Sequence, residues 1–256
     1  MNSSLRRILR FIIVISLGFA LVSCTRDKSA EKEPPNRASE SPKVVEEQQK
    51  RIEEAKRTVV AKVNGIPISM HEFIEEMNAI APQYIKPGQK RNPKTDEKIR
   101  KEALDRLIWR ELAVQEAKKV GMKAPEGAVA EELKRIKEDM KSEEAFRQNL
   151  SKSGITEEDL KRRVERTLLV EMITEKEIFG KLTVDLDEAK KVYEKKKGAF
   201  KGPSGPMTFE EARPLIENEL RTAAVHKRED EWVGALKKAA RIEIAPAGNA
   251  GQTKTE

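Results

Sequence analysis

Apolar residues recur at helical spacing through most of this chain, and this pattern constrains the fold more than any other feature. Between residues 95 and 121 the apolar positions lie three or four residues apart, and similar stripes follow in 125–200 and after residue 207. Residues three and four apart share one face of an α-helix, so each stripe predicts an amphipathic helix. We therefore expect a mainly α fold in which these helices form one domain.

Strand-like sequence stands only at the two ends of the helical region. VVAKV (59–63) and IPIS (66–69) flank Asn64-Gly65, a dipeptide typical of a two-residue hairpin turn. Pro67 has no N–H to donate, which places the second strand at a sheet edge. RIEI (241–244) alternates apolar and polar residues like a strand. Because an isolated hairpin is barely stable, we expect RIEI to pair with residues 59–63 and close a small β element.

Capping residues mark where several helices begin. Ser69 with Glu72, and Thr208 with Glu211, have the spacing of a capping box, in which the two residues exchange side chain–backbone hydrogen bonds. Thr95 is expected to cap the long helix that follows it. These positions predict the helix boundaries that the apolar stripes alone leave open.

The first 24 residues have the form of a bacterial lipoprotein signal. Three arginines precede an apolar run from Phe11 to Val22, which is shorter than the roughly 20 residues that span a bilayer. The run ends in LVSC, which resembles a lipobox, and Cys24 is the only cysteine of the chain. In such signals the chain is cut before the cysteine, and the thiol receives a lipid. The alternative is an ordinary signal peptide or uncleaved anchor in which Cys24 is incidental.

We therefore expect residues 1–23 to be a signal peptide and Cys24 to be lipidated. The protein would be held in the cell envelope by this lipid and face the periplasm. Thr25 follows the cysteine, where aspartate would be the inner-membrane retention signal of enteric bacteria, so the outer membrane is favoured. Residues 24–57 are expected to be a flexible tether, near whose end VVEEQQKRIEEAKRT (44–58) could form a short solvated helix. Residues 247–256 are expected to be a disordered tail, because polar, proline-containing sequence buries little apolar area.

Composition and motifs exclude several function classes. Removing residues 1–23 lowers the formal net charge from +7 to +4, and aromatic residues are only 4% of the chain. Nucleic-acid binding needs a concentrated basic patch with stacking aromatics, so no nucleic-acid partner is expected. His71 and Glu75 are too few ligands for a zinc site, and His71 and His226 are assigned to solvated helix faces. No metal, cofactor or catalytic residue is expected.

Five segments, in order, resemble the SurA and PrsA type of periplasmic foldase. VVAKVNGIPISMHEF (59–73) is similar to the hairpin and helix that open the chaperone domain of that family, and RIEI ends a helix and strand that return to it. The resemblance implies one composite chaperone domain over residues 58–246, with an N-terminal part (58–201) and a returning part (207–246). The similar segments are 59–73, 104–122, 142–173, 186–200 and 208–244.

The resemblance also explains the glycines and prolines clustered in residues 198–206, which we call the Gly/Pro knot. In that family a parvulin-type prolyl isomerase domain is inserted at this point, between the two chaperone segments. This chain has only KGPSGP there, and the two active-site histidines and Gly-rich turns of the isomerase have no counterpart. The resemblance therefore implies a chaperone without isomerase activity, and we expect the chain not to be an enzyme.

The resemblance implies that the partners are unfolded or nascent exported proteins, here called clients. An ATP-independent holdase needs accessible apolar residues that adapt to many sequences, a property of methionine. The candidate client-binding residues are Met77, Tyr84, Ile85, Met140 and Met172, although core packing is the common role of such methionines. Two alternatives stay open: a dedicated assembly or scaffold lipoprotein of a secretion or envelope machine, and a foldase whose isomerase is a partner protein.

Overall fold

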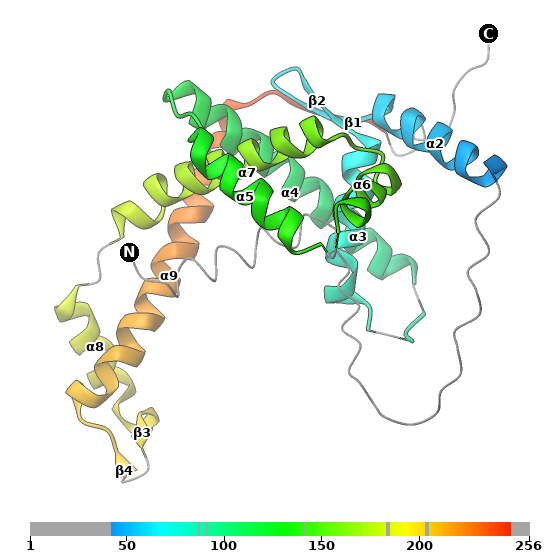
Figure 1. Ribbon diagram of the computed structural model, residues 1–256. Coiled ribbons are helices and arrows are strands. Elements are labelled where there is room, and N and C mark those ends of the chain that lie inside the picture. The colour runs from blue at the N-terminus through cyan, green and yellow to red at the C-terminus, as the bar shows by residue number, and fades with distance from the viewer. Residues whose placement is uncertain are drawn as a thin grey trace. The chain divides into compact units, whose positions relative to one another are not determined.

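The computed structural model describes residues 42–246 except 87, 91, 141, 183–184 and 203–204. The expected signal peptide, Cys24 and the tail 247–256 therefore lie outside the described residues. The described chain is mainly α with a few short strands, as predicted (Figure 1). It divides into two compact units. The first contains the described residues up to Glu111, 124–168 and those from Arg241; the second contains 112–123 and 169–240.

The small β element of the first unit has the predicted topology. Strands β1 (Val59–Val63), β2 (Ile66–Ser69) and β5 (Ile242–Ile244) form an antiparallel sheet in the order β2-β1-β5. Asn64 and Gly65 have φ values of 51° and 83°, so both turn residues adopt the left-handed conformation that a type I′ hairpin requires. Ala61 lies opposite Ile244 in the sheet. The prediction that the chain end returns to the opening hairpin is confirmed.

The helices of the first unit follow the apolar stripes. Ser69 caps α3 in a complete capping box with the predicted Glu72. In the second unit, Thr208 caps α9 (Phe209–Ala239) in the same way with Glu211. The helices α4 and α7 also continue into the second unit. The bounds are α2 (Pro42–Arg57), α3 (Met70–Tyr84), α4 (Pro93–Lys119), α5 (Glu126–Glu138), α6 (Glu143–Lys152) and α7 (Glu157–Glu177).

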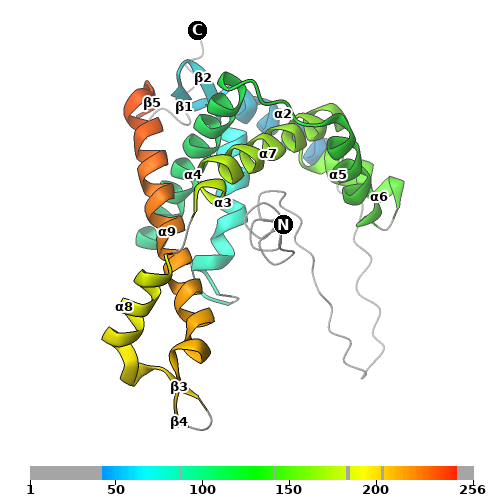
Figure 2. The same cartoon turned by 90° about the vertical axis from the view of Figure 1, so that its left-hand side faces the viewer.

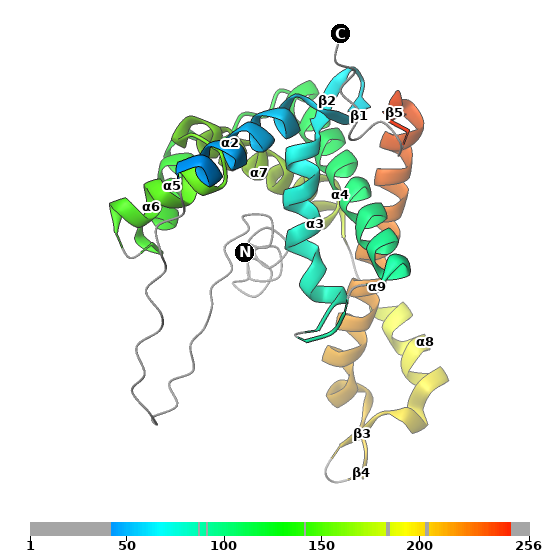
Figure 3. The ribbon, with the colours of Figure 1, turned by 90° about the vertical axis from the view of Figure 1, so that its right-hand side faces the viewer.

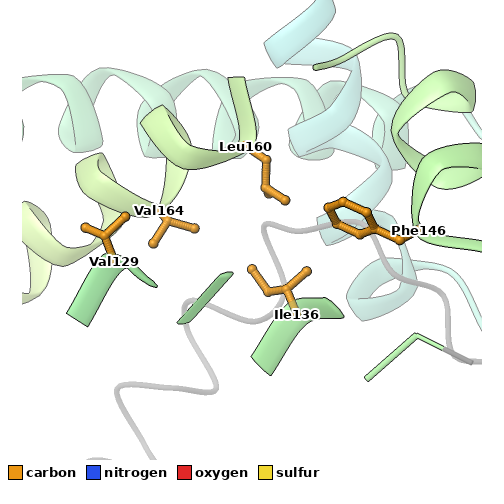
Figure 4. Packing of buried hydrophobic residues seen from close by; sticks show 5 residues of the cluster. All are labelled: Val129, Ile136, Phe146, Leu160 and Val164. Carbon is orange, nitrogen blue, oxygen red and sulfur yellow. The ribbon is translucent and has the colours of Figure 1, made fainter. Parts of the chain in front are cut away.

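One apolar core joins α5, α6 and α7. Figure 4 shows its five side chains pointing toward one another from the three helices. Phe146 of α6 is the largest of them and is only 1% exposed. Burying such a side chain contributes about 2–3 kcal/mol, so this cluster holds the short α6 in place. The cluster consists of Val129, Ile136, Phe146, Leu160 and Val164.

Residues 42–57 differ from the tether that we expect for residues 24–57. They form α2, which packs against α3 and β2 (Figure 3). Gln49 donates a hydrogen bond of 3.2 Å to the Ser151 carbonyl. Ile52 lies against Gly154, so close that a Cβ added to this glycine would be 2.3 Å from Ile52 Cγ2. The folded chain therefore begins before residue 58, because α2 finds apolar partners that are distant in sequence.

The second unit contains a helical hairpin with its own apolar core. The antiparallel pair α8 (Leu186–Lys196) and α9 (Phe209–Ala239) buries Ala189, Tyr193, Ala212 and Ile216 between the two helices (Figure 2). The 3₁₀ turn η1 (Phe179–Lys181) comes before α8. Pro214, in the second turn of α9, neither breaks nor restarts this helix.

The Gly/Pro knot forms a small β-hairpin between α8 and α9. After the 3₁₀ turn η2 (Lys197–Ala199), strand β3 (Lys201–Gly202) pairs antiparallel with β4 (Gly205–Pro206). The Tyr193 hydroxyl donates a hydrogen bond of 2.8 Å to the Met207 carbonyl. This bond fixes the start of α9 against α8. No helix in the described part of the chain is both long and apolar enough to cross a membrane.

Candidate functional site

Three of the five candidate client-binding residues lie together at the end of α3. Met77, Tyr84 and Ile85 all pack against a buried cluster formed by Ile80 of α3 with Ile99 and Ala103 of α4. Each of the three is half-buried, so part of each side chain remains accessible to solvent. We call Met77, Tyr84 and Ile85 the α3 elbow. Its residues contribute to the core and to the surface at once.

Tyr84 is held by a charged hydrogen-bond network. It is the last residue of α3 rather than a loop residue, because the helix continues through Pro82. Its hydroxyl donates to the Glu102 carboxylate, which also accepts from Arg106 Nη2. The hydrogen bond to Glu102 raises the pKa of Tyr84 above its ordinary value, because it stabilises the protonated phenol. The Tyr84 hydroxyl is thus fixed by hydrogen bonding, while its ring packs against the buried cluster of α3 and α4.

The accessible apolar surface extends along α3 through a residue that the sequence analysis did not select. Ile74 lies three positions before Met77 and is 41% exposed. Ile74, Met77, Ala81 and Ile85 are spaced so that they fall along one side of the helix. The signal for Ile74 was present in the sequence, since it lies beside the buried stripe. Its exposure depends on how α3 is rotated against its neighbours, and this rotation is set by tertiary packing.

The other two candidates lie elsewhere. Met140 follows α5 and packs against the α5–α6–α7 core, where its sulfur accepts a hydrogen bond of 3.4 Å from Asn149 Nδ2. Met172 lies on the part of α7 that belongs to the second unit and is half-buried. Met140 is half-buried, like the three residues of the α3 elbow, but it packs against a different core from theirs.

A second accessible apolar surface lies on α5. A depression of about 450 Å³ is lined by Ala130 and Leu133, with Lys134, Lys137 and Glu138 also in its wall. Leu133 is partly buried against the α5–α6–α7 core. The floor is apolar and the rim is charged. Such a surface offers hydrophobic contact to an extended chain, while the charges keep the edge hydrated.

Ion pairs, rather than apolar contacts alone, join the helices behind the α3 elbow. Glu76 is 4% exposed and pairs with Arg110 of α4 at 2.9 Å. Glu75 forms a bidentate pair with Arg163 of α7 at 3.1 and 2.8 Å. A third pair joins Glu111 of α4 to Arg166 of α7 at 2.5 Å. Each pair of helices among α3, α4 and α7 thus has its own Glu–Arg contact within the first unit.

The two histidines lie in different surroundings. His71 is half-buried rather than solvated, which corrects the expectation from the sequence. Its Nε2 donates a hydrogen bond of 3.0 Å to the Ser153 carbonyl, and its Nδ1 is 3.5 Å from Glu75. His226 is exposed on α9. Among the residues described, no three histidine, cysteine or acidic side chains are grouped so that they could hold a metal.

Comparisons with known proteins agree with this architecture. The family model of the SurA-like N-terminal domain matches residues 44–174, just over half of the chain. This match begins in α2, which is consistent with a folded region that starts before residue 58. No curated protein matches the chain.

A solved structure from Campylobacter jejuni is also similar. It comes from work describing the virulence factor PEB4 and the periplasmic protein Cj1289 as structurally related SurA-like chaperones. The identity is 14% and the TM-score is 0.46, and the alignment covers 75% of this chain and 100% of that chain. The family matched by residues 44–174 is one of chaperone domains, not of catalytic domains. This chain belongs to the family of SurA-like N-terminal domains.

Proposed function

We propose that this protein is a membrane-anchored, ATP-independent holdase that binds unfolded exported proteins in the periplasm. The observation that carries the proposal is the accessible apolar surface on a chaperone-type domain: the α5 depression and the α3 elbow, both edged by charged residues. An unfolded chain exposes apolar side chains without a fixed order. Half-buried methionine and isoleucine side chains suit such partners, because they offer contact area without a shaped pocket.

The proposed anchor is a lipid on Cys24, supported by the lipobox-like LVSC and the apolar run before it. Cys24→Ala should abolish incorporation of labelled fatty acid and block cleavage of the signal peptide. Cys24 is the only cysteine, so no other thiol can substitute for it. Continued lipid labelling of the variant would rule out this anchor and, with it, the proposed outer-membrane location.

The protein is further proposed to have no prolyl isomerase activity. The support is local: a two-strand hairpin, β3–β4, connects α8 directly to α9 at the place where the resembling foldases carry the isomerase. A proline-limited refolding assay checks this point. Acceleration of refolding by the purified chain alone would contradict it.

Aggregation suppression tests the holdase proposal. The Ser29–Glu256 fragment should keep several unrelated unfolded proteins soluble without ATP. Ile74→Gln should weaken this suppression, because Ile74 lies beside the α3 elbow. Leu215→Gln is a matched control, since Leu215 is 55% exposed on α9, and it should retain suppression. Suppression that is limited to one client would favour a dedicated assembly factor. Equal loss of suppression in both variants would contradict the assignment of client binding to the surface beside the α3 elbow.

A further inference from the structure

Lysines are concentrated at one end of the α8–α9 hairpin. Residues 190–201 contain six lysines and one acidic residue, Glu194. Four of these lysines lie at the end of α8, in η2 and on β3, and all four are exposed. Figures 1 and 2 show β3 and β4 at the free end of this hairpin of helices. We call these four the lysine tip: Lys195, Lys196, Lys197 and Lys201.

The lysine tip is built on a rigid aromatic support. The Tyr193 ring stacks on Phe200 at a centroid distance of 6.0 Å and meets Phe209 edge-on at 5.6 Å. Lys197 Nζ lies 5.5 Å from the centre of the Tyr193 ring, a cation–π contact. These contacts hold the backbone that carries the lysines, so the charges are presented together and not on a freely moving segment.

Much of this charge is not neutralised within the described chain. Lys196 pairs with Glu219 of α9. Lys195 and Lys201 have no ion pair with any residue that the structure describes, and Lys197 contacts only the aromatic ring. Positive charge at the end of α8 is favoured by the helix dipole. That effect involves the last turn of the helix, however, and does not explain Lys201 on the following strand.

We propose that the lysine tip contacts the phosphate-bearing headgroups of the membrane that holds the lipid anchor. A lysine close to an anionic membrane surface contributes about 1 kcal/mol, and neighbouring lysines add to one another. The proposal rests on the anchoring through Cys24 described under the proposed function. Seventeen residues separate Cys24 from Pro42, and they span at most about 60 Å when extended. An anchored chain therefore stays close to the surface, where even a weak contact is populated.

A label placed within the tip can report this contact. The Ser29–Glu256 fragment carrying Gly198→Cys has one thiol, and a Cβ at Gly198 would meet no atom within 4 Å. A fluorophore on this thiol is mixed with vesicles whose headgroups carry a nitroxide quencher. The vesicles are phosphatidylcholine alone or phosphatidylcholine with phosphatidylglycerol. The fragment lacks the apolar run and the three arginines of residues 1–23, which would bind vesicles by themselves, and without Cys24 the result does not depend on lipidation.

We expect quenching on vesicles with phosphatidylglycerol, little on phosphatidylcholine alone, and relief of quenching at high salt. Lys195→Gln with Lys201→Gln should weaken the apparent affinity about 25-fold, since about 1 kcal/mol per lysine is about fivefold. The matched control, Lys94→Gln with Lys98→Gln, removes two exposed lysines from α4 and should leave quenching unchanged.

Three results would overturn the proposal. The first is equal quenching on both kinds of vesicle. The second is an equal loss of affinity in the α4 control, which would make net charge, not the tip, responsible. The third is charge-dependent binding of polyglutamate by the tip without binding to vesicles, which would identify an acidic protein as the partner. Because aggregation suppression is measured separately, none of these results bears on the holdase proposal.

Discussion

The backbone N–H of Met207 donates a hydrogen bond to the carbonyl of Phe200, with 3.0 Å between nitrogen and oxygen. The chain therefore leaves α8 and enters α9 at neighbouring points, as a domain insertion site requires. The two ends of the Gly/Pro knot therefore lie close together. They are not free of packing, because Phe200 and Met207 both pack on the α8–α9 core.

An extension of the knot should be tolerated. Adding a Gly/Ser loop of about 20 residues between Gly202 and Gly205 should lower the free energy of unfolding by about 1 kcal/mol, because closure entropy grows slowly with loop length. The Phe200–Met207 hydrogen bond and the contacts of Tyr193 lie outside the extension. Urea unfolding measures the change. The same loop inserted after Leu220, inside α9, should be far more disruptive, and equal effects at both sites would contradict this account.

The buried carboxylate of Glu76 should destabilise the fold when the arginines that pair with it are removed. Arg110 pairs with Glu76 at 2.9 Å and Arg106 approaches it at 3.8 Å. Replacing both arginines by methionine should cost about 3–5 kcal/mol, because a buried charge loses its partners. Adding Glu76→Met to this variant should restore much of the loss in urea unfolding.

An exposed pair provides the comparison for this experiment. Arg51→Met removes the solvent-exposed pair with Glu47 and should cost less than about 1 kcal/mol. If Glu76→Met failed to recover stability in the background without Arg106 and Arg110, lost packing of the arginine stems would be the cause, not the uncompensated charge.

Adding one carbon at Gly154 should destabilise the fold, because Ile52 lies directly against this glycine. Gly154 has φ of +66°, and its Cβ would lie 2.3 Å from Ile52 Cγ2. Gly154→Ala should therefore lower the free energy of unfolding by more than about 1 kcal/mol and increase hydrogen exchange in α2. Gly127→Ala is the control: nothing lies within 4 Å of its Cβ, and alanine in a helix should stabilise by about 0.5–1 kcal/mol.

The start of α7 should contribute stability that depends on pH. The Thr156 backbone N–H donates to Asp159 at 2.8 Å, and this bond, with those from the Thr156 hydroxyl and Arg162, lowers the pKa of Asp159. A carboxyl whose pKa is lower in the folded state stabilises the fold above its unfolded pKa, and this contribution disappears as pH falls through the folded value. Asp159→Asn should thus destabilise at neutral pH. The difference should begin to shrink as pH falls below about 4, the ordinary value for aspartate, and should disappear only once pH lies below the lowered folded value.

The same helix start offers a control whose effect depends less on pH. Thr156→Ala removes the cap hydroxyl that accepts from the Asp159 N–H at 3.1 Å, which should cost about 1 kcal/mol. Most of this loss should persist in acid, because the backbone N–H of Asp159 does not titrate. If the difference in the free energy of unfolding between wild type and Asp159→Asn increased as pH fell, the proposed role of Asp159 would be contradicted.

Features that depend on a few neighbouring residues could be predicted from the sequence. Asn64-Gly65 determines the hairpin turn, and the Ser69 and Thr208 caps determine two helix starts, because the interacting atoms lie within four residues. The start of α4 was placed too late. Asn92, not Thr95, supplies the capping oxygen, since its side chain accepts from the Thr95 N–H at 2.9 Å. Both residues are good caps, and local sequence does not distinguish them.

Features that depend on distant partners could not be predicted. The polar sequence of α2 suggests a tether, and only its contact with Gly154, about 100 positions later, shows why residues 42–57 are folded. The same limit applies to the candidate site. Met77 and Met140 have similar surroundings in the sequence and are both half-buried, yet they pack against different cores. Which core a residue joins depends on the angles at which helices pack, and spacing alone does not specify them.

The pairing of β1 with β5 has a consequence for how this protein is made. Ala61 lies opposite Ile244. During synthesis, β1 is therefore made long before β5, the strand with which it pairs. Closing so long a stretch of chain is entropically slow and gives the domain a late, non-local folding step. The helices can form as they emerge, but the sheet cannot be completed before residue 244 is available. With this order of events, the edge of β1 that faces β5 stays unpaired until residues 242–244 have been made.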